Sequence, residues 1–351
     1  MSYGAIFWLA LQTCRERDSA KRAVFVLALV TAGYSVYGLV LYFLDSNAIL
    51  WFEKWAYEGF LTSTFVNRNT FATFAGLGLL CAVTSGMLHI RSNESGSYVG
   101  SSASRRIIRM LAELELTFYF SLAAVLLNGT ALLLTASRGG VSATVIAVFV
   151  FVAGIALRAK NAGRVAVLAF TVLIVVGGLL LGVSGGHVDE RLDHFAEKGF
   201  GATQRSIAFK QTAIAIEDYI YLGTGYGTFA DVFQAYSVPG IRAYFDYAHN
   251  TYLELALEIG LPAAGCLLIA VVLLAWRCFR GLERHSNAYL LAWLGCCATV
   301  LVGTHALVDF SVQIPGVACM YALLLGLGCS QSWSVTSKTD LPPSSLVTKR
   351  V

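Results

Sequence analysis

Charged residues are scarce in this chain. Asp, Glu, Lys and Arg make up 13% of its 351 residues, whereas hydrophobic residues make up 57%, and the mean hydropathy is +0.67. A water-soluble domain needs a more polar surface than this balance provides, so that class of protein is excluded. The composition instead indicates an integral membrane protein.

A cysteine framework is also missing. The eight cysteines include no Cys-x-x-Cys pair, and all lie in expected membrane spans or at their cytoplasmic ends. The pattern therefore indicates small apolar packing residues and neither a zinc site nor a disulfide framework. The opening run Tyr3–Gln12 is too short to cross a membrane and has no small-residue cleavage site after it, so no signal peptide is predicted.

Long apolar runs, by contrast, are abundant. Each of eight segments is long enough to cross a bilayer as a helix. The predicted fold class is therefore all-α: a polytopic transmembrane helical protein with about eight spans and a helical periplasmic loop. The expected spans are 23–44, 63–88, 116–136, 139–157, 165–183, 262–279, 288–308 and 315–333.

The basic residues set the expected orientation. If residues 1–22 are cytoplasmic, 17 of the 25 Lys and Arg residues fall on the cytoplasmic side and 8 on the other, as the positive-inside rule requires. The net charge of +4 thus reflects topology and does not imply a nucleic-acid partner. The expected order is a cytoplasmic N-terminus (1–22), five spans (23–183), a periplasmic loop (184–261), three spans (262–333) and a cytoplasmic tail (334–351).

The long loop ends in a pattern typical of a helix start. Thr251 followed by Glu254 forms a capping box, which predicts a helix that begins at Thr251. Gly260 suits the left-handed position after this helix, and Pro262 suits the first position of the next. His249 then lies in the loop beside a helix N-terminus, where a neutral imidazole could accept a proton. From the residues alone, a histidine that bonds the backbone is the commoner explanation.

Two arginines are expected at the outer membrane surface. Arg138 lies in the short turn Thr135–Gly140, where an arginine costs about 1–3 kcal/mol unless a carboxylate or phosphate neutralises it. The two glycines that follow would let a ligand approach the backbone, although bonds to helix-end carbonyls would explain this arginine equally well. Arg205 falls in the first turn of an amphipathic helix expected over 204–218, where it opposes the helix dipole unless both share an anion.

Other polar residues flank the same surface. Arg68 could reach an anionic ligand, although snorkelling to lipid head groups is commoner. His305 and Asp309, spaced i and i+4, are expected on one helix face, as a structural pair in preference to part of the site. Residues 182–185 resemble the serine motif of rhomboid-type intramembrane proteases, but the companion histidines and asparagine have no counterpart, so this alternative is not favoured.

Short motifs follow one another along the chain: Asn67–Ala72, Ser137–Gly140, Arg205 in its helix, Gly223–Phe229, Ala248–Glu254 and His305–Phe310. In this order they resemble the O-antigen ligase and polymerase superfamily. The resemblance covers about residues 65–330 and is strongest over 130–262. The chain departs from the family in having eight expected spans where the family commonly has more, which suggests that helices before residue 23 are missing.

The resemblance implies a metal-independent glycosyltransferase without a cofactor, at the outer face of the bacterial inner membrane. Its donor would be a glycan on undecaprenyl pyrophosphate; a ligase passes the glycan to lipid A-core, and a polymerase passes it to another lipid-linked repeat. A ligase is the first choice and a polymerase the alternative. A transporter would need polar residues deep within several spans, whereas the ionisable groups here gather at one surface.

The resemblance also assigns roles. It implies that Arg138 and Arg205 bind the pyrophosphate and that His249 is the essential histidine of a catalytic periplasmic loop. Negative charge grows on the departing pyrophosphate, and fixed arginines stabilise it more in the transition state than before it. The outside loops contain no Asp/Glu-x-Asp cluster of the kind that metal-dependent glycosyltransferases use. Expected supporting residues are Asn67, Arg68, Asn69, Asn250, His305 and Asp309.

Overall fold

A computed structural model of the chain describes residues 2–93, 116–158, 204–238, 245–283 and 288–333. Within these ranges the chain forms ten α-helices, and its strands are limited to a two-stranded antiparallel hairpin of β1 (Ala48–Ile49) and β2 (Phe52–Glu53). The predicted all-α fold class is therefore confirmed.

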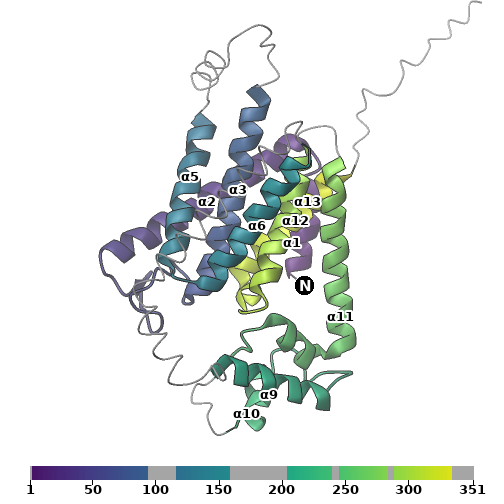
Figure 1. The fold of residues 1–351 in the computed structure, drawn as a ribbon. Coiled ribbons are helices and arrows are strands. Elements are labelled where there is room, and N and C mark those ends of the chain that lie inside the picture. Colours follow the sequence, from purple (N-terminus) through teal and green to yellow (C-terminus); the bar gives the residue numbers. More distant parts are fainter. Residues whose placement is uncertain (1, 94–115, 159–203, 239–244, 284–287, 334–351) are drawn as a thin grey trace, which may run out of the picture.

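Most of the molecule is a helical bundle (Figure 1). Helices α3 and α12 lie at its centre. The most apolar 18-residue stretches of α3 and α12 are 78% and 72% buried, whereas those of α2 and α5 are 33% and 28% buried. The inner helices can pack on all sides because their side chains are small or apolar all round, and the outer helices keep an apolar face toward lipid. The bundle consists of α1 (Ser2–Thr13), α2 (Arg17–Phe43), α3 (Arg68–Asn93), α5 (Leu116–Leu134), α6 (Arg138–Ala156), α12 (Ala288–His305) and α13 (Pro315–Ser332).

Six of the described helices are long and apolar enough to cross a membrane. They coincide with six of the eight expected spans, which supports a multi-pass membrane protein. The expected span 315–333 does form a helix, α13, but it falls outside this set. The expected span 165–183 and the serine motif at 182–185 lie outside the described residues. The six are Arg17–Phe43, Arg68–Ile90, Leu116–Leu134, Arg138–Ala156, Thr251–Glu283 and Ala288–His305.

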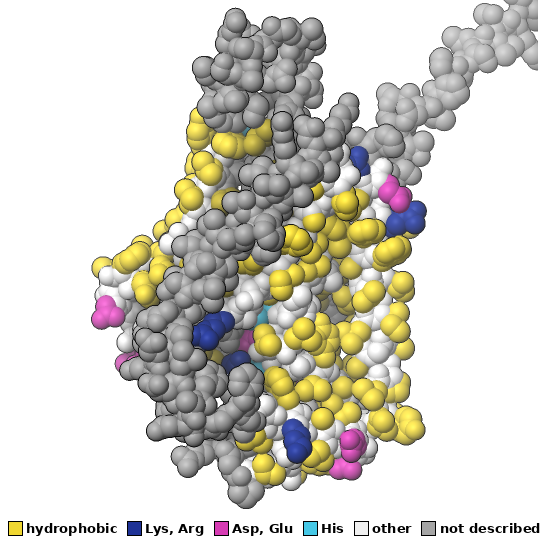
Figure 2. All heavy atoms as spheres, viewed as in Figure 1, with side chains coloured by type: hydrophobic (Ala, Val, Ile, Leu, Met, Phe, Trp, Pro, Cys, Tyr) yellow, Lys and Arg dark blue, Asp and Glu magenta, His cyan; other side chains and the backbone are white. Residues whose placement is uncertain are grey.

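Helix α11 (Thr251–Arg280) stands at the edge of the bundle. Hydrophobic side chains cover the right-hand side of the space-filling view, and charged side chains gather at the top and at the bottom of that side (Figure 2). Ile269, Val272 and Leu273 on α11 are each about 60% exposed: 61%, 63% and 61%. An apolar face of this size is unfavourable in water and is accommodated by a bilayer.

Helices α9 (Gln204–Asp218) and α10 (Phe229–Ala235) lie beyond the end of the bundle and pack on the first part of α11. The bounds predicted for the helix over 204–218 are confirmed. A separate small core holds this region together, and it includes Ala215, Phe229, Phe233 and Leu257. The first part of α11 therefore packs against α9 and α10 and not against lipid.

A sharp bend at Gly260 divides α11 into two helical pieces. Gly260 has φ 77° and ψ 156°, the left-handed conformation that the sequence predicted. A Cβ at this position would also lie 2.3 Å from the carbonyl oxygen of Tyr221, so only glycine fits. The backbone N–H of Leu261 donates to the carbonyl of Ile220 at 2.9 Å, which ties the end of α9 to the bend. Pro262 follows in the first turn of the second piece, as expected.

Candidate functional site

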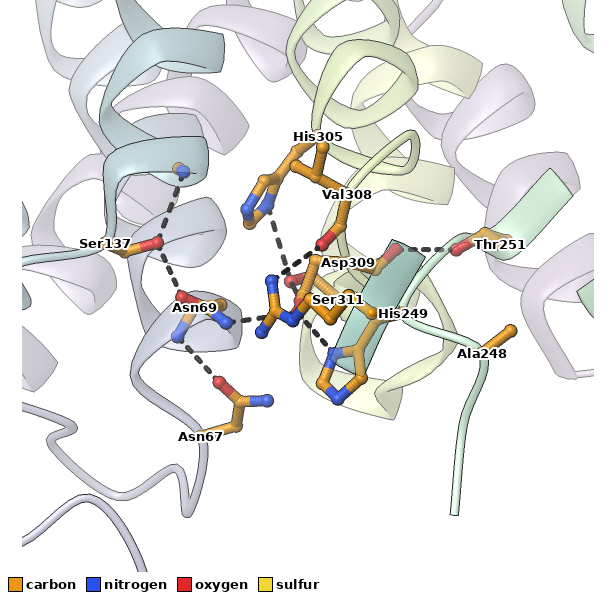
Figure 3. Close-up of polar contacts among 12 residues, drawn as sticks. Asn67, Asn69, Ser137, Ala248, His249, Thr251, His305, Val308, Asp309 and Ser311 are labelled. Atoms are coloured by element: carbon orange, nitrogen blue, oxygen red, sulfur yellow. Dashed lines mark hydrogen bonds and ion pairs between the residues drawn. The ribbon is translucent and has the colours of Figure 1, made fainter. Parts of the chain in front are cut away.

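The candidate site lies at one end of the bundle. Here the N-termini of α3, α6, α9 and α11 surround the segment 306–314 that connects α12 to α13 (Figure 3). A helix N-terminus presents unpaired N–H groups and the positive end of the helix dipole. The first turns of α3, α6 and α9 contain no acidic residue but hold Arg68, Arg138 and Arg205. This arrangement concentrates positive charge and favours the binding of an anion.

Helix α11 begins at Thr251, as predicted, but its cap differs from the prediction. Asn250 is the N-cap, because its extended backbone lets its side-chain oxygen accept hydrogen bonds from the backbone N–H groups of Tyr252 and Leu253, both at 3.1 Å. The predicted capping box of Thr251 and Glu254 is therefore wrong. The hydroxyl of Thr251 donates to the carbonyl of Asp309 at 3.1 Å, and Glu254 accepts from a backbone N–H before the helix. Asn250 thus supports the site by anchoring the helix that follows His249.

His249 lies in the loop just before α11, as expected, and its imidazole faces Asp309 (Figure 3). Nδ1 of His249 is 3.5 Å from Oδ1 of Asp309, at the outer limit of a hydrogen bond. The backbone of His249 has φ 52°, a left-handed conformation that residues other than glycine seldom adopt. Strain of this kind, about 1–3 kcal/mol, is typical of functional positions. The ring of Phe310 lies 5.1 Å from the imidazole, centroid to centroid, and closes one side of it.

Asp309 is the acidic centre of the described cluster. Its side chain is 1% exposed; Oδ1 accepts a hydrogen bond from Asn69 at 3.2 Å, and Oδ2 accepts one from Ser311. Burial by itself raises the pKa of this carboxyl group, but the nearby His249 and His305 and the hydrogen bond from Ser311 together hold the pKa below its usual value. Asp309 is therefore ionised at neutral pH.

Asn69 joins the first turns of two helices to Asp309. Its side-chain oxygen accepts from the hydroxyl of Ser137 at 2.8 Å, while its amide donates to Asp309. Ser137 is the N-cap of α6 and accepts from the backbone N–H of Gly140 at 3.2 Å. Asn67 in turn accepts from the backbone N–H of Asn69 at 2.7 Å and so caps α3. Asn67 and Asn69 thus hold the site together through hydrogen bonds that the short motif alone did not predict.

The predicted arrangement of His305 and Asp309 on one helix face is wrong. Helix α12 ends at His305, and Asp309 lies in the connection beyond it. Nδ1 of His305 is 2.6 Å from the hydroxyl of Thr73 on α3 and 3.4 Å from that of Ser311. Ser311 therefore lies between the two residues and contacts both, and His305 also links α12 to α3.

The three arginines differ in their surroundings. Nη1 of Arg205 lies 3.4 Å from the carbonyl oxygen of Val308, beside Asp309. The guanidinium of Arg68 lies over the ring of Phe60, 4.1 Å from its centre. Arg138 is exposed and, within the part of the chain that the structure describes, has no hydrogen-bond or ion-pair partner. The alternative in which Arg138 bonds helix-end carbonyls is not observed among these residues.

The two glycines after Arg138 serve helix packing. A Cβ at Gly139 would lie 3.1 Å from Nε2 of His305, and a Cβ at Gly140 would lie 2.5 Å from Cβ of Ala72. The atoms that approach this backbone so closely belong to α12 and α3. The interpretation that these glycines admit a ligand is therefore corrected: they allow α6 to pack against two neighbouring helices.

Two residues of the site were not predicted from the sequence. Ser311 connects Asp309 to His305, and its position two residues after Asp309 was the available signal. Tyr57 comes from the loop before α3 and is half-buried. Burial raises the pKa of Tyr57, the charge of Asp309 raises it further, and Arg205 and Arg68 act in the opposite direction. Tyr57 therefore lies within the electrostatic reach of all three charged groups, and no motif indicated this.

Comparison with known protein families identifies the domain. The O-antigen ligase family matches residues 123–268. This match over residues 123–268 supports the O-antigen ligase superfamily for this chain. This confirms the family predicted from the motifs, whose members are glycosyltransferase-like ligases and polymerases that use lipid-linked glycans. No curated protein matches the chain.

The segment matched by the O-antigen ligase family includes Arg138, Arg205 and His249. Asn69 and Asp309 lie outside the matched segment, yet both are hydrogen-bonded into the same cluster. The candidate site thus includes residues from before and after the matched segment. Among the described residues, no group of three or more His, Cys, Asp or Glu side chains is placed to hold a metal ion.

Proposed function

We propose that this member of the O-antigen ligase superfamily transfers a glycan from undecaprenyl pyrophosphate to lipid A-core or a similar acceptor. The reaction takes place at the periplasmic face of the bacterial inner membrane and needs neither a metal nor a cofactor. The observation that carries the proposal is the contact of His249 with a buried, ionised Asp309 inside a ring of helix N-termini that bear arginines. Neither nucleic acid nor a soluble partner has a part in it.

His249 is the proposed general base. Because Nδ1 faces Asp309, a proton on Nδ1 leaves Nε2 free to accept the proton of the acceptor hydroxyl. As this proton moves, the acceptor oxygen bonds to the anomeric carbon, and the bond from that carbon to the pyrophosphate breaks with its electron pair on the leaving oxygen. The carboxylate of Asp309 stabilises the imidazolium that forms. The proton then passes from His249 to solvent or to the released pyrophosphate.

Arg138 and Arg205 are the proposed pyrophosphate ligands. Both lie in first turns of helices, so guanidinium and backbone N–H groups face the same anion. Each charge-assisted hydrogen bond to phosphate contributes roughly 1.5–3 kcal/mol. Because the donor's lipid tail stays in the bilayer, these bonds form where water is scarce and electrostatic stabilisation is strong.

A gel of surface glycan from a deletion strain tests the proposal. Loss of all attached chains indicates a ligase, whereas a single attached repeat indicates a repeat-unit polymerase, which the family match supports equally. The wild-type gene should restore the wild-type pattern, and a His249→Ala gene expressed at the same level should not. An unchanged surface glycan in the deletion strain would contradict both versions of the proposal.

A further inference from the structure

A pocket lies beside the candidate site, between the C-terminal end of α2 and the loop that precedes α3. Its volume is about 230 Å³. This is smaller than the roughly 300–1,000 Å³ of pockets that enclose drug-sized ligands, and it suits one phosphate group or one sugar ring. Its lining includes two residues of opposite charge, Lys54 and Asp45, and the polar residues Ser46, Asn47, Thr62 and Ser63.

Lys54 is the unusual residue of this pocket, because it is a buried cation. The residue is 6% exposed, and Nζ donates to the carbonyl of Phe60 at 2.6 Å. An ammonium group has three N–H donors, and among the described residues this carbonyl is its one acceptor. Burial lowers the pKa of Lys54, and the charge of Glu58 offsets this in part. Burial of an ammonium group is costly, and an anion bound in the pocket would offset part of that cost.

The loop that forms the pocket is built to lie at a membrane interface. Its hairpin and the following turn expose Trp51, Phe52 and Trp55, which are 80%, 57% and 70% exposed. Tryptophan side chains concentrate at the level of lipid head groups, where the ring meets apolar chains and the N–H meets water. The pocket is therefore expected at the depth of lipid phosphates.

The pocket and the candidate site share a wall. Phe60 lines the pocket, and the guanidinium of Arg68 lies over its ring. The next residue, Leu61, donates its backbone N–H to the carbonyl of Leu134 at 3.4 Å, at the end of α5 and just before the turn that leads to Arg138. A ligand in the pocket is thus next to the arginine-bearing helix N-termini without occupying their anion site.

We infer that this pocket binds the phosphate group of a saccharide lipid and so positions the acceptor for transfer. The shape limits the ligand to one small anionic group, Lys54 supplies the charge, and the exposed tryptophans place the pocket at head-group level. The acceptor role rests on the proposed function, whereas binding of the lipid phosphate can be measured in the absence of any glycan transfer.

Native mass spectrometry of the full chain in nanodiscs tests the binding. The probes are lipid A with two phosphates, the same lipid with both phosphates removed, phosphatidylglycerol and inorganic phosphate. We expect Lys54→Met to weaken binding of diphosphorylated lipid A at least tenfold. The control is Lys210→Met, since Lys210 is an exposed lysine of α9; its affinity should equal that of the wild type.

A second variant tests the pocket while leaving Lys54 and its hydrogen bond in place. The hydroxyl of Ser46 lines the pocket and makes no hydrogen bond among the described residues, so Ser46→Leu fills the space without breaking the bond from Lys54 to Phe60. We expect the same tenfold loss. Equal binding of the dephosphorylated lipid, or full affinity in both variants, would overturn the inference. If inorganic phosphate at equal concentration displaces lipid A, the pocket binds free phosphate. If phosphatidylglycerol is retained as well as lipid A, the pocket binds bulk lipid. Either result overturns the acceptor role.

Transfer assays separate this inference from the proposed function. If the wild type transfers glycan and Lys54→Met raises KM for the acceptor with kcat and donor KM unchanged, both stand. If transfer proceeds with an unchanged acceptor KM in Lys54→Met, the pocket has no acceptor role and the proposed function survives. If phosphate-dependent lipid binding is present but the wild type transfers nothing, the proposed function fails while the binding site remains.

Discussion

Replacing Asp309 with asparagine removes a charge from the centre of the candidate site and leaves its shape intact. The amide oxygen can still accept from Asn69, and the hydroxyl of Ser311 can rotate to accept from the new NH₂ group. The structural cost is therefore that of weakened charge-assisted bonds, about 1–3 kcal/mol of unfolding free energy. Asp309→Ala should cost more, because it leaves buried polar groups of Asn69 and Ser311 without a partner.

The effect of Asp309→Asn on transfer should be much larger than its effect on the fold. Without the carboxylate, the imidazolium of His249 loses its stabilising charge and its preferred proton position. We expect kcat to fall by roughly 10²–10⁴, the range that general acid–base catalysis supplies. The assay is single-turnover transfer from a lipid pyrophosphate donor in nanodiscs, with unfolding followed in parallel. Transfer at the wild-type rate by a correctly folded Asp309→Asn protein would refute the role of Asp309.

The same variant has a defined pH dependence. The pKa of Asp309 is lower in the folded protein than the usual value of about 3.9 for an unfolded chain. A lowered carboxyl pKa contributes stability that is complete above the unfolded value and is lost as the pH falls through the folded value. The stability difference between wild type and Asp309→Asn should thus be constant from about pH 8 to 5 and shrink below about pH 4. A difference that grew with acid would contradict this sign.

Three further variants test other parts of the site. His249→Ala should lower transfer at least about a hundredfold with normal membrane insertion, because it removes the proposed base; near-normal transfer would exclude it. Arg138→Lys should weaken donor binding about tenfold, since an ammonium lacks the bidentate fork, and Arg280→Lys at the opposite end of α11 is the control; equal affinities would remove Arg138 from the site. Asn250→Ala should lower the unfolding free energy by about 0.5–2 kcal/mol, measured by thermal melting, and Asn250→Asp, which keeps a capping oxygen, should not; wild-type stability of Asn250→Ala would restore the capping box.

Much of the fold was predictable because long apolar runs and helix boundaries are local signals. The bounds of α9 and the left-handed Gly260 followed from periodicity and from glycine's conformational freedom. The extent of the buried face of α9 did not: Ala215 is fully buried, whereas the neighbouring Ile214 is 39% exposed. Which side of a helix is buried depends on what packs against it, and that partner is distant in the sequence.

The candidate site shows the same limit. Local patterns and the family resemblance indicate His249, Arg138 and Arg205, each of which lies at a helix N-terminus, and their roles stay predictions. The bonds from Asn69 to Asp309 and Ser137 join residues 240 and 68 positions apart, and no local pattern encodes them. Even the helix cap was assigned to the wrong residue, because Thr-x-x-Glu and Asn at N-cap are both good start signals one position apart. The final choice depended on the connection after α12, which gives Thr251 a different partner.

The gathering of arginines in helix first turns has a consequence for turnover. A sugar-linked pyrophosphate diester carries two negative charges, and once the sugar has left, the lipid pyrophosphate can carry a third. Under the proposed function, a site that stabilises the departing group would hold the spent carrier more tightly than the fresh one. We therefore expect departure of the carrier, and not bond formation, to limit the steady rate. The first turnover should be faster than all later ones, and an enzyme that removes the terminal phosphate from the spent carrier should raise the steady rate.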